Sequence, residues 1–265
     1  MNKLILCLTF IIILTTLIYP HESNRTKEIY FRILNDPFHI LDAIKEAIEL
    51  EKKNDLSDEE KSWSVLVASE LLRNAGYISG CLVNSASYKS DYIAKASQVL
   101  EAYQKDEESY PYFIFEKTMN DILQNIKADS DSITATTYSD FTVVNLARGL
   151  KLYTNNDYQN ALDILFTISN TEELSWEKWW ANRYIASIYQ QLNQPEKAEE
   201  YLKKNIENNP DFPHFYENLG SFYYSQRKYD KALEIVRQGL KKGKYPNLVA
   251  LLDNIYAKKL TAVPY

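Results

Sequence analysis

The feature that most constrains the fold is a pattern of residues that recurs 34 positions further along the chain, within residues 181–244. The two occurrences share the same spacing of apolar and small side chains. A fixed period of this length is typical of helical hairpins that stack side by side, because one hairpin alone cannot bury its apolar face. The matching positions are Ile185, Ala186, Tyr189, Ala198 and Leu202, which recur as Leu219, Gly220, Tyr223, Ala232 and Val236.

Each occurrence divides into two helices. Ile185 and Tyr189 are four residues apart and therefore lie on one face of a first helix. The small Ala186 between them allows close approach of a second helix, which we expect to begin near Pro195. Pro210 lacks the N–H group that would continue this second helix. The sequence therefore predicts pairs of antiparallel helices.

A looser third copy lies upstream, at an offset of 71 residues from the last one. This offset is three residues more than two periods. We expect the three additional residues in the connection Asn170–Ser175, because connections accommodate insertions at little thermodynamic cost. The copy is carried by Gly149, Leu152, Tyr158, Ala161 and Leu165.

The three copies resemble the tetratricopeptide repeat family, over 142–178, 179–212 and 213–246. The resemblance implies an all-α fold in which antiparallel helical hairpins stack as a right-handed superhelix. A further amphipathic helix at 247–260 would cover the end of the stack. Its apolar residues are Leu248, Leu251, Leu252 and Ile255.

In that family the first helices of successive repeats line a concave groove, so the resemblance implies a groove that holds a protein or peptide partner. Aromatic and arginine side chains would contribute most of the contact energy there. From the second and third copies the groove residues are Trp180, Arg183, Tyr184, Ser187, Gln190, His214, Glu217, Asn218, Ser221 and Tyr224, and from the first copy Leu146, Leu150 and Tyr153.

Three of the four tryptophans fall within one helical turn, at 176, 179 and 180. At spacings of three and four they cannot all point into one core. Two interpretations remain open: at least one, with Trp180 the candidate, lines the groove, or the three form an aromatic plug between the first and second copies.

The amino terminus carries an apolar run over residues 4–19, preceded by Lys3 and ended by Pro20. Residues 1–20 are thus a signal sequence or an N-terminal membrane anchor. As a helix the run would measure about 24 Å, less than the roughly 30 Å of a hydrocarbon core, which favours a signal sequence. The absence of a small-x-small cleavage pattern favours an uncleaved anchor. In both cases we expect the body on the exported side, periplasmic or extracellular, and not in the cytoplasm.

Residues 36–130 predict further helices without a clean period. Asp36 with Pro37, and Ser57 with Glu60, are helix-start patterns. We expect Gly76 and Gly80 to end the helix that begins near Ser57. Further helices are expected over 88–104 and 111–127, before a linker at 128–137. The region is either a set of degenerate repeats or a separate helical bundle.

The sequence offers no pattern for catalysis, a metal or a cofactor. The three histidines are far apart, and His214 with Glu217 is interpreted as a surface pair one helical turn apart. Six glycines are few for a phosphate-binding loop, and a net charge of −6 gives no general attraction to nucleic acid.

We therefore expect a non-catalytic scaffold for protein–protein interaction on the exported side of a membrane. The alternative is an accessory subunit of an envelope enzyme complex, for example in glycan synthesis or ligation. A minor alternative is an enzyme that uses residues 36–130.

Overall fold

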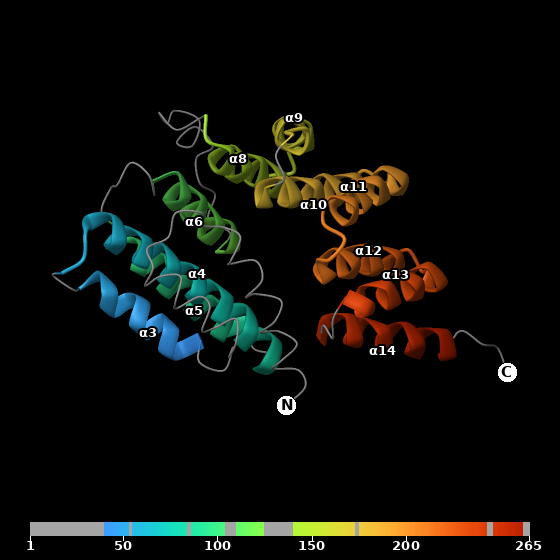
Figure 1. The fold of residues 1–265 in the computed structure, drawn as a ribbon, viewed down its shortest axis with the longest axis horizontal. Helices are drawn as coiled ribbons and strands as arrows, with labels where there is room; N and C mark the ends of the chain where they lie inside the picture. The colour runs from blue at the N-terminus through green and yellow to red at the C-terminus, as the bar shows by residue number, and fades with distance from the viewer. Residues whose placement is uncertain are drawn as a thin grey trace. The chain divides into compact units, whose positions relative to one another are not determined.

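The computed structural model describes residues 40–52, 55–83, 86–103, 110–124, 140–172, 175–242 and 246–261. All regular secondary structure in these ranges is helical (Figure 1). The apolar segment 4–19, the Asp36-Pro37 pattern and the linker at 128–137 lie outside them. Within these ranges, no helix has both the length and the apolar character needed to cross a membrane. The chain divides into two compact units, one ending at Ile164 and the other beginning at Leu165.

The first unit is built around its longest helix, α4, which packs against α3, α5 and α6, while α6 also packs against α8. The capping box predicted for α4 is confirmed: Ser57 Oγ accepts a hydrogen bond from the Glu60 N–H (3.1 Å), and Glu60 Oε2 accepts one from the Ser57 N–H (3.0 Å). Trp63, Leu66 and Phe115 are fully buried in this unit. The helices are α3 (Ile40–Glu51), α4 (Asp58–Val83), α5 (Ala86–Leu100), α6 (Tyr110–Leu123) and α8 (Thr142–Thr154).

The prediction that Gly76 and Gly80 end the helix is wrong, because α4 continues through both to Val83. A glycine inside a helix costs roughly 0.5–1 kcal/mol relative to alanine. That penalty ends a helix only where the following backbone turns into another conformation, and here 26 residues remain helical. The helices expected over 88–104 and 111–127 span Ala86–Leu100 and Tyr110–Leu123.

The second unit contains the predicted helical hairpins (Figure 1, orange to red). The helix pairs α10 with α11, α11 with α12, and α12 with α13 pack against each other, and α14 packs against both α12 and α13. Helix α9 (Tyr158–Ser169) contains the boundary between the units. The other helices are α10 (Trp176–Gln191), α11 (Pro195–Asn208), α12 (Pro213–Ser225), α13 (Tyr229–Lys242) and α14 (Pro246–Thr261).

The repeated apolar positions form the core of these hairpins. Ile185, Ala186, Leu219 and Val236 are all buried. The close approach predicted for the small residue is confirmed at Gly220, where an added Cβ would lie 2.9 Å from Val236 Cγ2 and 3.1 Å from Leu251 Cδ2. The recurring sequence pattern is therefore a packing pattern.

The three additional residues of the first connection lengthen a helix instead. Helix α10 has 16 residues, whereas α8 and α12 have 13 each. The extension is the first turn of α10, which starts early because Ser175 caps it: the Ser175 side chain accepts a hydrogen bond from the Lys178 N–H (3.3 Å). The expectation that connection 170–175 alone holds the insertion is thus wrong.

The turn inside each hairpin places one residue in the left-handed region of φ. These residues are Asn156 (φ 64°), Asn193 (φ 55°) and Arg227 (φ 58°), at equivalent positions of the three copies. In the last turn, the Arg227 N–H donates to the Tyr224 carbonyl (3.0 Å) and the Lys228 N–H to the Tyr223 carbonyl (2.9 Å). This is the Schellman arrangement that closes helices.

A chain of buried polar side chains joins three helices of the second unit. Ser169 Oγ donates to Asn182 Oδ1 (2.5 Å), and Asn182 Nδ2 donates to Asn205 Oδ1 (2.8 Å). Asn205 Nδ2 then donates to the backbone carbonyl of Trp179 (3.0 Å). Each side chain finds a partner, so the polar groups are buried without an unsatisfied amide.

The following repeat fills the same two positions differently. Tyr216 occupies the position of Asn182, and Gly239 that of Asn205, each 34 residues later. The Tyr216 ring packs against Gly239, and its hydroxyl donates to the Pro210 carbonyl (2.8 Å). A large side chain beside a glycine replaces two asparagines of intermediate size.

Candidate functional site

The ten residues proposed to bind a partner occupy five positions on α10 and the same five positions, 34 residues later, on α12. We refer to them as the repeat-face residues. They are Trp180, Arg183, Tyr184, Ser187 and Gln190 on α10, and His214, Glu217, Asn218, Ser221 and Tyr224 on α12. All lie in the second unit.

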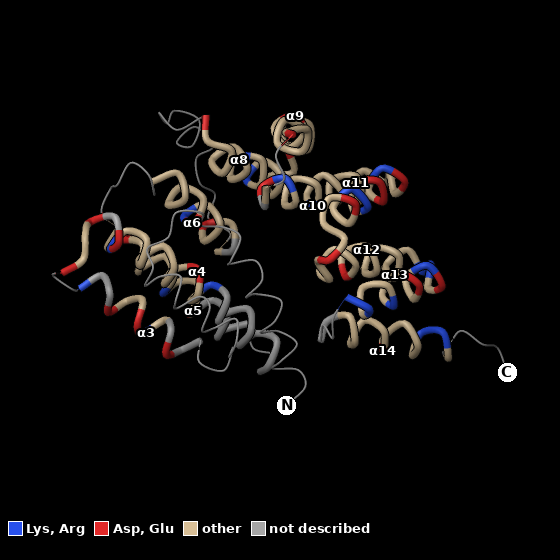
Figure 2. The backbone as a smooth tube through the Cα atoms, in the orientation of Figure 1, with Lys and Arg blue, Asp and Glu red and all other residues tan. Residues whose placement is uncertain are grey.

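Few charged residues accompany this set. Helix α12 carries a single carboxylate, Glu217, and no lysine or arginine. In contrast, α11 and α13 carry acidic and basic residues along their length (Figure 2). A surface poor in charge and rich in aromatic side chains has the composition of the central part of protein interfaces.

On α10 the repeat-face residues centre on an aromatic pair. The rings of Trp180 and Tyr184 stack with centroids 5.9 Å apart and planes 24° apart. Both side chains and Arg183 are half-buried, and Gln190 is exposed. Burial raises the pKa of Tyr184, and the charge of Arg183 opposes this shift. The phenol is therefore neutral at physiological pH and available as a hydrogen-bond donor.

On α12 the corresponding positions are joined by hydrogen bonds. His214 Nδ1 lies 3.2 Å from Glu217 Oε2, and His214 Nε2 lies 3.3 Å from Asn218 Nδ2. Since the amide nitrogen donates to Nε2, the proton of a neutral ring is on Nδ1 and is donated to the carboxylate. The interpretation of His214 and Glu217 as a surface pair is wrong for the histidine, whose exposed fraction is only 8% because it lies among Phe212 and Phe215.

The remaining repeat-face residues on α12 are more open. Ser221 is exposed, and Tyr224 is half-buried against Tyr229, with ring centroids 5.7 Å apart. The two helices therefore present accessible side chains toward their carboxyl ends, at Gln190 and Ser221, and more buried ones nearer their starts.

Trp179 is a packing residue of the second and third copies. Its ring lies 5.4 Å from Phe215, edge to face, and 5.9 Å from Phe212. An aromatic plug was one of two interpretations of the tryptophans, placed between the first and second copies. The structure puts Trp179 one interface later, because the early start of α10 brings its first turn beside the start of α12. The Trp176 side chain lies outside the described residues.

The groove residues expected from the first copy are not available to a partner as predicted. Leu146 and Leu150 are buried, and α6 packs against the helix that carries them. Tyr153 is half-buried, with its ring 6.1 Å from that of Tyr158. The resemblance could not indicate this, because α6 lies outside the repeat pattern.

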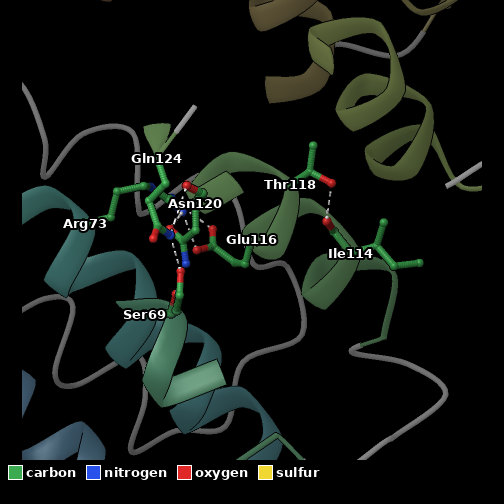
Figure 3. A network of polar contacts seen from close by, with 8 residues as sticks. Ser69, Arg73, Ile114, Glu116, Thr118, Asn120 and Gln124 are labelled. Atoms are coloured by element: carbon green, nitrogen blue, oxygen red, sulfur yellow. Dashed lines mark hydrogen bonds and ion pairs between the residues drawn. The ribbon is translucent and has the colours of Figure 1, made fainter. Parts of the chain in front are cut away.

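A second polar cluster, which the sequence did not reveal, lies in the first unit (Figure 3). Arg73 on α4 and Glu116 on α6 form a bidentate ion pair, with Nη1 to Oε2 at 2.5 Å and Nη2 to Oε1 at 2.9 Å. Asn120 accepts from Arg73 Nη1 (3.5 Å) and donates to Ser69 Oγ (3.0 Å). All four side chains are buried and bonded to one another, so the cluster joins two helices.

Among the described residues, no group of three or more His, Cys, Asp or Glu side chains is arranged to hold a metal ion. One sequence signal of the Arg73–Glu116 pair exists: Arg73 follows Leu71 and Leu72 in an apolar run. Its partner 43 residues away has no local signature.

The comparison with protein families decides the nature of the hairpins. A family model described as tetratricopeptide repeat matches residues 185–212 and 213–241. The chain carries tetratricopeptide repeats. The matched segments coincide with the second and third copies inferred from the 34-residue period.

Solved structures with similarity to this chain include two of IFIT1. One is a monomeric mutant with Gppp-AAAA, with a TM-score of 0.47, and the other a monomeric mutant with m7Gppp-AAAA, with a TM-score of 0.48. Each is 13% identical, and each similarity covers 97% of this chain and 70% of IFIT1. No curated protein matches the chain.

Proposed function

We propose that this protein is a tetratricopeptide repeat scaffold that binds a protein or peptide partner through its repeat-face residues. The observation that carries the proposal is the stacked Trp180–Tyr184 pair on α10, followed along the same helix by the exposed Gln190. Half-buried aromatic side chains supply contact area and lose little conformational entropy when a partner binds.

The chemistry of the site supports binding over catalysis. The polar repeat-face residues of α12 form contacts within one helical turn, His214 to Glu217 and His214 to Asn218. Neither contact joins a nucleophile to a base, as catalytic sites require. Helical repeat arrays in general act as scaffolds that hold other proteins.

We further propose that residues 4–19 anchor the chain in a membrane or direct its export, with the repeats on the exported side. Support comes from the sequence alone: an apolar run after Lys3, ended by Pro20. Mass spectrometry of the native protein tests the anchor directly. A mass that begins at Met1 supports it, and a mass that begins after Tyr19 replaces it with a cleaved signal.

Site-specific photo-crosslinking tests the binding surface. A photoreactive residue at Gln190 or Ser221 should crosslink a defined partner in cells, and Trp180→Ala should reduce that yield. The same probe at Gln238, an exposed position on α13, is the matched control and should give none. Equal crosslinking from Gln238 would refute the assignment of the surface.

The identity of the crosslinked protein separates two forms of the proposal. A soluble or anchored exported protein corresponds to a general adaptor. A polytopic envelope enzyme, together with loss of its product on deletion of this chain, corresponds to an accessory subunit.

A further inference from the structure

The last helix of the array, α14, has apolar side chains on its outward side as well as on its buried side. Leu248, Leu251 and Ile255 are buried against the repeats. On the outward side, Val249, Tyr256 and Leu260 are exposed by 42%, 39% and 76%. They are seven and four residues apart and therefore follow one helix face. Terminal elements of repeat arrays require a polar outer face for solubility, so this face departs from the rule.

The outward face of α14 is complementary to itself. Besides the three exposed apolar residues it comprises half-buried Leu252 and exposed Asp253 and Ala257. We propose that this face pairs with the same face of a second copy of the chain, antiparallel, about a two-fold axis between positions 254 and 255. Such an isologous contact brings one surface against itself. Val249 then faces the second copy's position 260, Leu252 faces 257, and Asp253 faces 256.

Charge supports the antiparallel arrangement. Arg237 Nη2 on α13 donates to the Tyr256 hydroxyl (2.7 Å), so its guanidinium lies beside that ring. The antiparallel pairing therefore places the Asp253 carboxylate of each copy near the Arg237 guanidinium of the other, twice per dimer. A parallel pairing in register would place the two Asp253 carboxylates together, which is unfavourable.

The size of the contact sets its strength. One helix of 16 residues offers less surface than the roughly 800 Å² per partner of a standard interface. The dimer is accordingly weak and concentration-dependent, with a dissociation constant of about 1 μM or higher.

Sedimentation velocity of the full chain over a concentration series tests the dimer. Leu260→Asp should raise the dissociation constant at least about tenfold, because it buries an unpaired charge in the contact. Its side chain is mostly exposed in the single chain, so folding should be unaffected. The matched control is Leu192→Asp, an exposed leucine at the end of α10, which should leave the constant unchanged.

A charge exchange tests the orientation. Asp253→Arg and Arg237→Asp should each weaken the dimer, and the two together should restore it. Stronger association of Asp253→Arg alone would overturn the antiparallel arrangement. A chain that stays monomeric at all concentrations, or a Leu260→Asp variant that dimerises as the wild type does, would overturn the proposal. Crosslinking of α14 to a different protein in place of a second copy would also overturn it.

Discussion

Replacement of Gly239 by alanine is a sensitive test of how the third repeat packs. A Cβ at this position would lie 2.6 Å from Tyr216 Cβ and 2.8 Å from Leu248 Cδ1. Carbon atoms in favourable contact are about 3.5–4.0 Å apart, so both distances are short by roughly 1 Å. The Tyr216 Cβ is attached directly to the α12 backbone, and a change of rotamer cannot move it away.

The expected cost follows from two opposing effects. Overpacking of a filled core costs about 1–3 kcal/mol, and removal of a glycine from a helix interior returns about 0.5–1 kcal/mol. The Tyr216 hydroxyl is held by the Pro210 carbonyl (2.8 Å), which opposes relaxation of the ring. We therefore expect Gly239→Ala to lower the free energy of unfolding by about 1–2 kcal/mol.

Urea denaturation of the full chain, followed by circular dichroism, measures this change. Gln238→Ala, one residue earlier on the exposed side of α13, is the control and should change stability by no more than about 0.5 kcal/mol. Gly220→Ala should cost less than Gly239→Ala, because its nearest neighbour is a methyl group of the Val236 side chain at 2.9 Å. A Gly239→Ala protein as stable as the wild type would refute the packing argument.

Three further substitutions test other parts of the structure. Arg227→Asn should raise the free energy of unfolding by about 0.5–1 kcal/mol in urea denaturation, because the equivalent turn positions with positive φ are asparagines and arginine is strained there; a loss would contradict this. Glu116→Ala should cost about 3–5 kcal/mol by thermal unfolding because it leaves Arg73 buried without its carboxylate, whereas Arg73→Met combined with Glu116→Leu should cost much less. Burial alone would raise the pKa of Glu199, but hydrogen bonds from Lys203 and Tyr223 lower it below the ordinary 4.5, so this carboxylate stabilises the fold above that pH and the stabilisation is lost as the pH falls. Burial and the same hydrogen bond raise the pKa of Tyr223, so Glu199→Gln should weaken the acid dependence of stability and lower the Tyr223 pKa, read from phenolate absorbance; an unchanged Tyr223 titration would count against the bond.

The repeat helices could be predicted from sequence because their signals are local. Ile185 and Leu219 are buried where the period places them, and the second helices begin at Pro195 and Tyr229, close to the expected Pro195 and Lys228. A packing position in a repeat depends on neighbours within one or two periods, so its residue type reflects its surroundings directly.

The features that were missed depend on distant partners or on small local preferences. Leu146 has the spacing of a groove residue, yet it is buried in the unit where α6 packs on its helix. The ion pair of Arg73 and Glu116 joins residues 43 positions apart. The early start of α10 depends on one cap, Ser175, whose effect of about 1 kcal/mol decides where the extra turn forms.

Of the proposed site, the sequence indicated which residues share a position but not how far each is exposed. Trp180 and His214 occupy equivalent positions, and one is half-buried while the other is buried. The difference comes from Phe212 and Phe215, which cover the histidine ring. Aromatic residues in the preceding loop have no equivalent in the period.

The buried contact between Asn182 and Asn205 has a consequence for how such an array can be rearranged. In the next repeat the same contact is made by Tyr216 and Gly239, and the two pairs cannot be mixed. Tyr216 opposite an asparagine would collide, and Asn182 opposite a glycine would leave an amide unsatisfied. Deletion or duplication of one hairpin is therefore safe only when both members of a pair move together, so these pairs mark where the protein can be cut and rejoined.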